Sequence, residues 1–274
     1  MANQLLGLLL VGGKSSRMGM NKAQISYQGN IPEWLRIREL MNKFCDNVYI
    51  CCPQDQAGNY EPPIVLDRAD GPLAAISDAD NAHPGNAWLV VACDLPLLDY
   101  TTLETLVDNR DQSIVGTYYN SVFDGKPEPL CAIYEPSFFP AIHQSIVNNQ
   151  FCPRNLFLEH GALGIDLADA SALKNANTPA EKLEVEAILA QSMKSKLVTI
   201  RYFAQLREIA KIDSEELTTT SVTPAGLYEE LQIKYQFPQK LKQLMIAING
   251  DFAEWETKLE DGDEVVFIPP VAGG

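Results

Sequence analysis

Near the start of the chain an apolar run changes into a glycine-rich, basic loop: residues 5–22 read LLGLLLVGGKSSRMGMNK. The run Leu5–Val11 predicts a strand buried on both faces, as in a parallel sheet. The adjacent glycines after it let the backbone approach a ligand closely, and consecutive N–H groups in such a loop form a nest for anions. Arg17 and Lys22 can add positive charge around a triphosphate. We favour phosphate binding, although the loop matches neither common phosphate-binding pattern and a loop with solvated basic side chains is the alternative.

The first two-thirds of the sequence alternates apolar strands with helical stretches, which predicts a mostly parallel sheet covered by helices on both faces. The expected strands are Leu5–Val11, Val48–Cys52, Ile64–Leu66, Ala87–Ala92, Ser113–Thr117 and Leu130–Tyr134. The expected helices are Pro32–Phe44, Pro72–Asn81, Tyr100–Asn109 and Pro136–Asn148. In α/β folds of this kind, ligands bind at the carboxyl ends of the strands.

A capped helix closes this part of the chain. Thr178 supplies an N-cap, Pro179 the first helical position and Glu181 the third, which is the pattern of a capping box. Apolar residues at helical spacing follow, and the pattern ends just before residue 195. We therefore expect a first domain over residues 1–193 and a second domain over residues 196–274.

The last 80 residues have the pattern of a small α+β domain. The expected strands are Lys196–Phe203, Met245–Asn249, Asp251–Glu256 and Glu264–Ile268, and the expected helices are Phe203–Ala210 and Pro224–Tyr235. Asn249-Gly250 predicts a hairpin with a type I′ turn, while Thr218–Thr220 fits a strand or a solvated turn. The last strand leads into the tail PPVAGG. Because Gly273 and Gly274 have no Cβ, this tail can enter a channel too narrow for other residues, which suits a carboxylate that itself reacts.

Charge and composition exclude several classes of function. A net charge of −15 argues against non-specific binding of nucleic acid, so no nucleic-acid partner is expected. No stretch is long and apolar enough to predict a membrane span. The six cysteines contain no C-x-x-C pair and the three histidines lack metal-ligand spacing. We expect reduced thiols, no zinc site and a cytoplasmic location.

Four motifs within residues 4–190 resemble those of molybdenum cofactor guanylyltransferase. In chain order they are LVGGKSSRMGMNK (10–22), GPLAA (71–75), CDLP (93–96) and NANTPAE (175–181). This family has a Rossmann-like nucleotidyltransferase fold and transfers GMP from GTP to molybdopterin, with release of pyrophosphate. The resemblance implies an α/β nucleotidyltransferase that uses Mg²⁺, with GTP and molybdopterin as substrates.

The resemblance also implies roles for individual residues. Asp94, just past the expected strand Ala87–Ala92, corresponds to the family's Mg²⁺ ligand, and Lys22 to the lysine that contacts the nucleotide phosphates. Both are expected to be catalytic. The implied nucleotide-binding set is Leu10, Val11, Gly12, Gly13, Arg17, Lys22, Asp67, Gly71 and Asp94. From the residues alone, the competing role for Asp94 is a helix N-cap.

Departures from the family pattern lie near the presumed nucleotide and pterin sites. Asn21 stands where an aspartate is common, Cys52–Gln54 where an asparagine ends the second strand, and Ala75 where a glycine is usual. Glu128 occupies a position where a basic residue or a histidine is expected. These changes leave open whether the domain is active and whether it prefers GTP; a CTP-using relative is the nearest competitor.

Residues 196–274 resemble the small subunit of molybdopterin synthase, a β-grasp (ubiquitin-like) sulfur carrier. The segments that carry this resemblance are VTIRYFA (198–204), ING (248–250), LEDGDEV (259–265) and the closing PPVAGG. In that family an E1-like adenylating enzyme activates the terminal glycine, which becomes a thiocarboxylate, and the large synthase subunit accepts the tail. The resemblance implies that Gly274, preceded by Gly273, carries the sulfur and that these two proteins are the partners.

We therefore interpret the sequence as a fusion protein of molybdenum cofactor biosynthesis. Two alternatives stay open. One is a sulfur carrier fused to a catalytically degenerate or CTP-using nucleotidyltransferase-like domain. The other is a carrier for another sulfur pathway, such as thiamine synthesis or tRNA thiolation.

Overall fold

The computed structural model describes residues 4–12, 22–28, 31–68, 71–192, 194–255 and 257–269. The chain divides into two compact units, Met1–Glu186 and Ala187–Gly274. This division falls inside the helix α6 (Pro179–Ser192). The domain boundary expected from the sequence, just after this helix, stays a prediction.

The first unit is built on a seven-stranded sheet with the order β3-β2-β1-β4-β6-β5-β7. Its strands are β1 (Leu5–Leu10), β2 (Val48–Cys52), β3 (Ile64–Leu66), β4 (Ala87–Ala92), β5 (Gly116–Asn120), β6 (Pro127–Tyr134) and β7 (Leu163–Ile165). Neighbouring strands are parallel except where β6 pairs with β4 and with β5. The expected mostly parallel α/β sheet is confirmed.

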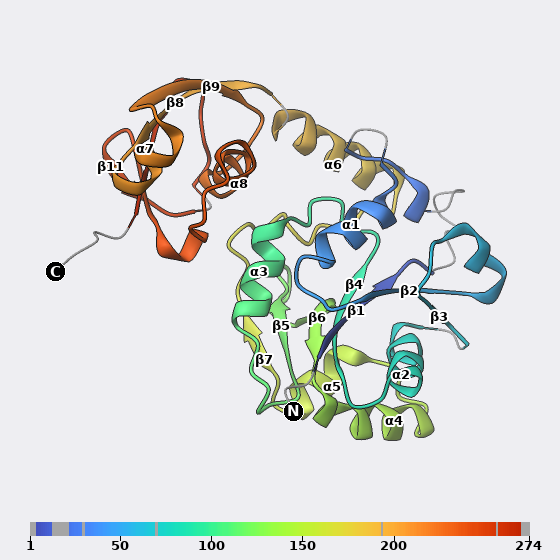
Figure 1. Ribbon diagram of the computed structural model, residues 1–274. Helices are drawn as coiled ribbons and strands as arrows, with labels where there is room; N and C mark the ends of the chain where they lie inside the picture. The colour runs from blue at the N-terminus through green and yellow to red at the C-terminus, as the bar shows by residue number, and fades with distance from the viewer. Residues whose placement is uncertain are drawn as a thin grey trace. The chain divides into compact units, whose positions relative to one another are not determined.

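Helices cover both faces of this sheet (Figure 1). The helices are α1 (Glu33–Met41), α2 (Pro72–Ala82), α3 (Tyr100–Asp108), α4 (Phe139–Val147) and α5 (Pro153–Glu159). All six residues of β1 are buried, because alternate side chains enter two separate cores. Leu9 packs in a core that includes Ile37 of α1, and Leu8 in a core that includes Ile76 of α2.

The strand predictions were wrong in one region, the antiparallel part of the sheet. The strand expected at Ser113–Thr117 lies at Gly116–Asn120, and the one expected at Leu130–Tyr134 begins earlier, at Pro127. Two prolines in β6 hide its strand character, because proline removes a ladder donor. The register also shifts between Tyr118 and Tyr119. Both α5 and β7 are short and were not predicted.

The second unit is a five-stranded sheet with the order β11-β10-β12-β8-β9. Its strands are β8 (Lys196–Tyr202), β9 (Ser214–Thr219), β10 (Met245–Ile248), β11 (Asp251–Ala253) and β12 (Glu264–Ile268), and its α-helices are α7 (Ala204–Ala210) and α8 (Pro224–Tyr235). Leu227, Tyr228 and Leu231 of α8 are fully buried. Asn249 and Gly250 both have positive φ, as a type I′ turn requires. This is the expected β-grasp fold, and the uncertain threonine segment proves to lie in or just after strand β9.

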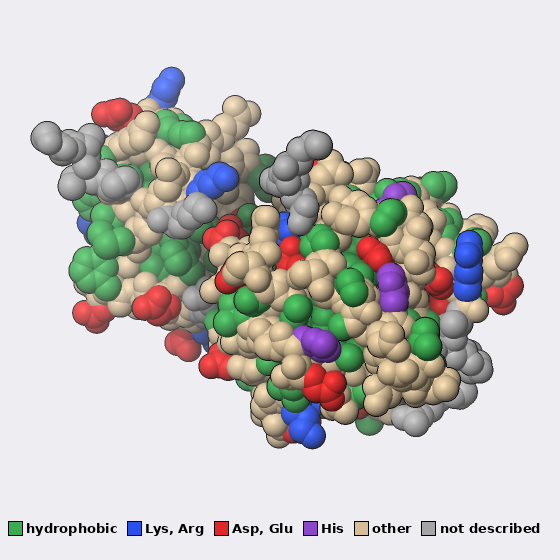
Figure 2. Space-filling view, turned by 90° about the horizontal axis from the view of Figure 1, so that it is seen from below, with side chains coloured by type: hydrophobic (Ala, Val, Ile, Leu, Met, Phe, Trp, Pro, Cys, Tyr) green, Lys and Arg blue, Asp and Glu red, His purple; other side chains and the backbone are tan. Residues whose placement is uncertain are grey.

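Side chains capable of binding metal are dispersed over the described part of the chain. No three His, Cys, Asp or Glu residues among these positions gather into a cluster that could hold an ion by itself. Figure 2 shows the histidine side chains standing apart on the face in view. The six cysteines are free thiols, and Cys51, Cys52, Cys93 and Cys131 are buried. No helix of the described ranges is both long and apolar enough to cross a bilayer.

Candidate nucleotide-transfer site

The carboxyl ends of β1, β2 and β4 are held side by side by backbone hydrogen bonds. The N–H of Val11 donates to the carbonyl of Cys51 (3.1 Å), and the N–H of Cys93 donates to the carbonyl of Leu10 (3.0 Å). These bonds extend the parallel ladders one residue past the strands. The residues that follow each strand, including Gly12 and Asp94, therefore share one edge of the sheet, where α/β folds bind ligands.

Three distant segments meet at Asp94. The ammonium nitrogen of Lys22, at the start of the 3₁₀ turn η1 (Lys22–Gln24), lies 3.6 Å from Oδ2 of Asp94. The same ammonium group donates to Oδ1 of Asn177, and the N–H of Ala176 donates to the carbonyl of Asp94 (3.1 Å). The structure thus brings together the two expected catalytic side chains. It adds Asn177, which was quoted in a family motif but not chosen as a site residue.

A capping box fixes the backbone at Asn177. The N–H groups of Asn177 and Thr178 both donate to Oε2 of Glu181, over 2.7 and 2.9 Å. In return the N–H of Glu181 donates to the hydroxyl of Thr178 (3.2 Å). This is the capping box expected at the start of α6. It holds the residue that contacts Lys22 against a helix end.

A buried ion pair supports the loop after Asp94. Glu33 is fully buried, and its carboxylate accepts from the guanidinium of Arg36 at 2.5 Å. Arg36 also donates to the carbonyls of Leu98 (2.8 Å) and Leu95 (3.2 Å). A guanidinium presents several donors in a fixed plane, so Arg36 ties α1 to the segment that follows Asp94. No motif in the sequence pointed to this pair.

Gly12, Asp67 and Gly71 line the same edge beyond β1. A Cβ on Gly12 would lie 3.2 Å from Cδ of Pro53 and 3.7 Å from Oδ2 of Asp67, so the space there suits glycine. The N–H of Asp67 donates to the carbonyl of Cys52 (3.0 Å). Gly71 is the N-cap of α2 with φ +108°, a conformation that favours glycine. Of the other predicted site residues, Gly13, Arg17, Gly273 and Gly274 lie outside the described residues.

Burial dominates the electrostatics of the site. It raises the pKa of Asp94, and the nearby charge of Lys22 opposes this rise. Burial, together with the nearby carboxylates of Glu33, Glu186 and Asp94, raises the pKa of Tyr27 to about 12. Tyr27 therefore keeps its proton at neutral pH and remains a hydrogen-bond donor beside the acidic group.

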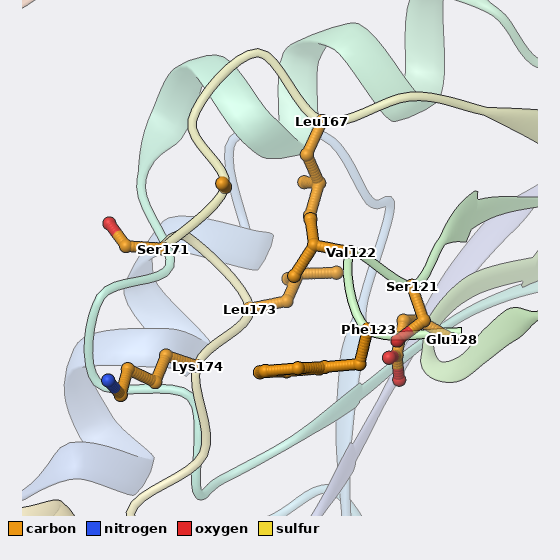
Figure 3. Close-up of a pocket in the computed structure, with 9 residues that line it drawn as sticks. Ser121, Val122, Phe123, Glu128, Leu167, Ser171, Leu173 and Lys174 are labelled. Atoms are coloured by element: carbon orange, nitrogen blue, oxygen red, sulfur yellow. The ribbon is translucent and has the colours of Figure 1, made fainter. Parts of the chain in front are cut away.

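An open cavity of about 240 Å³ lies at the same sheet edge (Figure 3). One wall is the connection between β5 and β6, with Val122, Phe123 and nearby Glu128. The other is the segment after β7, with Leu167, Ala170, Ser171, Leu173 and Lys174. In Figure 3 the ring of Phe123 lies flat below Leu173, and its far end points toward Lys174.

The match to a known family covers most of this unit. Residues 7–161, more than half of the chain, match the family model of the MobA-like NTP transferase domain. The chain belongs to this family. A molybdenum cofactor guanylyltransferase of Pseudomonas paraeruginosa is 31% identical over 180 residues, which are 63% of this chain and 89% of that protein. Residues 200–274 match the ThiS family model, so the chain joins a MobA-like domain to a ThiS-like domain.

Two further comparisons concern a longer relative and solved structures. The molybdenum cofactor biosynthesis bifunctional protein of Synechocystis is 39% identical over 137 residues; the match covers 48% of this chain but only 39% of that protein. The crystal structure of molybdopterin-guanine dinucleotide biosynthesis protein A from Archaeoglobus fulgidus superposes with a TM-score of 0.58, covering 68% of this chain and 99% of that chain. At 20% identity, this likeness establishes the fold of the MobA-like domain.

Proposed function

We propose that the chain serves molybdenum cofactor biosynthesis and that its MobA-like domain transfers GMP from GTP to molybdopterin. The observation that carries this proposal is the contact of Lys22 with both Asp94 and Asn177 at the carboxyl edge of the sheet. It occurs in a family whose curated relatives include molybdenum cofactor guanylyltransferases. The rest of the nucleotide site is proposed at Leu10, Val11, Gly12, Gly13, Arg17, Asp67 and Gly71.

The reaction needs positioning and charge stabilisation more than acid or base chemistry. An oxygen of the acceptor phosphate bonds to the α-phosphorus of GTP while the bond from that phosphorus to the α,β-bridging oxygen breaks, and pyrophosphate leaves. Lys22 stabilises the negative charge that develops on the phosphates. Asn177 and Asp94 hold its ammonium group in place, so little reorganisation is needed during transfer.

Asp94 fits a role as a magnesium ligand. Mg²⁺ in nucleotide sites is bound through one or two carboxylates, with phosphates and water supplying the other oxygens. The partly buried carboxylate of Asp94 at this edge, where Asp67 also lies, matches that donor set. When bound, the ion would neutralise charge on the triphosphate. Asp94 would hold it on the side of the site that faces Lys22.

The test is pyrophosphate release with molybdopterin and Mg²⁺, comparing GTP, CTP and ATP. Release with GTP alone supports the proposal, and release with CTP favours a cytidylyl transferase. No release with any of the three favours a catalytically degenerate domain, in line with the departures at Asn21 and Pro53.

For the ThiS-like domain we propose sulfur delivery by a thiocarboxylate on Gly274. The family match runs to the last residue, and β12 at the centre of the sheet leads into the tail. The proposed partners are an E1-like adenylating enzyme and the large subunit of molybdopterin synthase. We place the protein in the cytoplasm, where its free thiols would stay reduced.

Mass spectrometry tests the carrier role. After incubation with the adenylating enzyme, ATP and a sulfide donor, the mass should rise by one oxygen-to-sulfur exchange. Deletion of Gly274 should abolish the gain. Rescue of a strain that lacks the small synthase subunit supports the molybdopterin pathway, whereas rescue of a thiamine or tRNA-thiolation carrier alone contradicts it.

A further inference from the structure

The cavity beside the transfer site has an exposed aromatic wall. Phe123 is 87% exposed and Val122 is 51% exposed, and both line this open cavity. Large apolar side chains grouped at one concave place on a surface mark a binding site more often than scattered ones do. The volume, about 240 Å³, suits one ring system rather than a whole nucleotide.

The turn that carries Phe123 is held by several hydrogen bonds. The N–H of Ser121 donates to the carbonyl of Lys126, and the N–H of Gly125 donates to the carbonyl of Ser121, each over 2.8 Å. Arg154 of α5 pairs with Asp124 (3.3 Å) and with Glu128 (3.2 Å). These bonds fix the turn, so the exposure of Phe123 belongs to an ordered wall of the cavity.

The cavity lies within reach of the transfer site. Its second wall ends at Lys174, and only residues 175 and 176 separate this residue from Asn177. A fully extended chain advances by at most about 3.6 Å per residue, so the two Cα atoms are within about 11 Å of each other. Asn177 contacts Lys22. The end of the cavity wall at Lys174 is therefore close to the residue that contacts Lys22.

The lining favours a flat heteroaromatic ring with N–H donors along one edge. Phe123 offers a ring face, and Leu167 and Leu173 offer apolar contacts on the other wall. Glu128 supplies a carboxylate, of which Oε2 already accepts from Arg154. Lys174 is engaged by Glu184, at 2.5 Å. A carboxylate next to an aromatic face matches the donor-rich edge and flat face of a pterin.

We propose that this cavity binds the pterin end of the acceptor, with its ring against Phe123 and its N–H edge on Glu128. The inference rests on the proposed guanylyl transfer and assigns its acceptor subsite. It separates the two substrates: Lys22 and Asp94 serve the phosphates, while Phe123 and Glu128 select the ring. The two walls set how far that ring lies from the reacting phosphate.

Steady-state kinetics of the full chain tests this assignment. Phe123→Ala should raise KM for molybdopterin about tenfold or more through loss of ring stacking. Phe123→Leu should fall between Phe123→Ala and the wild type. Glu128→Gln keeps the shape but removes the charge, and should raise the same KM about tenfold. KM for GTP and kcat at saturating acceptor should stay within about twofold. Phe252→Ala removes a phenylalanine that is 76% exposed in the other unit and should change nothing.

A binding measurement without catalysis separates this inference from the proposed function. Saturation-transfer difference NMR with 6-hydroxymethylpterin should show contact with the wild type and a loss of signal in Phe123→Ala. Contact without GMP transfer would overturn the proposed function and leave the pterin site standing. GMP transfer with unchanged molybdopterin KM in both Phe123→Ala and Glu128→Gln would overturn the pterin site alone. Equal NMR signals in wild type and Phe123→Ala would also overturn it.

Discussion

The ammonium nitrogen of Lys22 lies 3.6 Å from Oδ2 of Asp94, and each side chain is only 21% exposed. Lys22 begins the turn η1, and Asp94 follows strand β4. Asn177, just before α6, completes the contact through Lys22. Three segments far apart in the sequence thus place one cation and one carboxylate at the sheet edge where we propose that the phosphates bind. The consequences of removing either charge can be measured separately.

Asp94→Asn should lower kcat of GMP transfer by about a thousandfold or more, because the amide cannot replace a carboxylate as a magnesium ligand. Pyrophosphate release at saturating GTP and Mg²⁺ measures the loss. Asp108→Asn, at the exposed carboxyl end of α3, changes the same charge elsewhere in this unit and should leave kcat unchanged. Equal activity of Asp94→Asn and wild type would contradict the role of Asp94.

Asp94→Asn should also stabilise the metal-free protein at neutral pH. Burial raises the pKa of Asp94 in the folded state, so the folded protein binds this proton more tightly than the unfolded chain does. The contribution of Asp94 to folding stability is therefore complete below its unfolded pKa of about 3.9. It is lost as the pH rises through the higher pKa of the folded state. In EDTA at neutral pH, Asp94→Asn should have a higher Tm than wild type, and the difference should shrink toward about pH 4. A lower Tm for the variant across this range would refute the sign.

Arg36→Gln should destabilise the protein by about 3–5 kcal/mol, because it leaves the buried Glu33 carboxylate without its partner. Glu33→Gln in the same chain should restore much of the loss, which urea denaturation can measure. Arg110→Gln breaks another buried pair, with Glu135, at 2.6 Å. That pair adjoins the opposite edge of the sheet, after the end of β6. Only Arg36→Gln should also raise KM for GTP under conditions where both variants are folded.

Thr178→Ala should cost about 1 kcal/mol of stability by removing the side-chain half of the capping box. Because this box holds the backbone at Asn177, kcat should fall by roughly three- to tenfold, as expected for a slightly misplaced catalytic group. Thr223→Ala removes the corresponding N-cap of α8 in the second unit. It should lower stability to a similar extent without changing GMP transfer; equal kinetic effects of both substitutions would argue against a positioning role.

Much of the fold could be predicted because local signals agreed with the final packing. Strands β2, β3 and β4 have the predicted bounds, since each is an apolar run between turn residues. The capping box at Thr178 marked the start of α6 correctly. The motifs identified Lys22 and Asp94, and the structure places these side chains together.

The features that the sequence did not predict depend on contacts that no local pattern reveals. The pair of Glu33 and Arg36 occupies successive turns of α1 and would pass for a surface pair in the sequence. Its burial follows only from how α1 packs on the loop after Asp94. The cavity beside Phe123 joins two segments that meet only through the pairing of β5 with β6 and β7. The sequence around Phe123 has no hydrophobic periodicity that would show whether this side chain is exposed or buried.

Strand β12 has a mechanical consequence for the second unit. It lies in the middle of the sheet, parallel to β8 and antiparallel to β10, and it ends at Ile268 just before the tail. A partner that draws the tail outward pulls on this strand from its carboxyl end, while the rest of the chain holds β8 from its amino end. Because the two strands are parallel, such a pull loads their hydrogen bonds in shear and all at once. The second unit should therefore stay folded under tension that would open a sheet pulled apart one strand at a time.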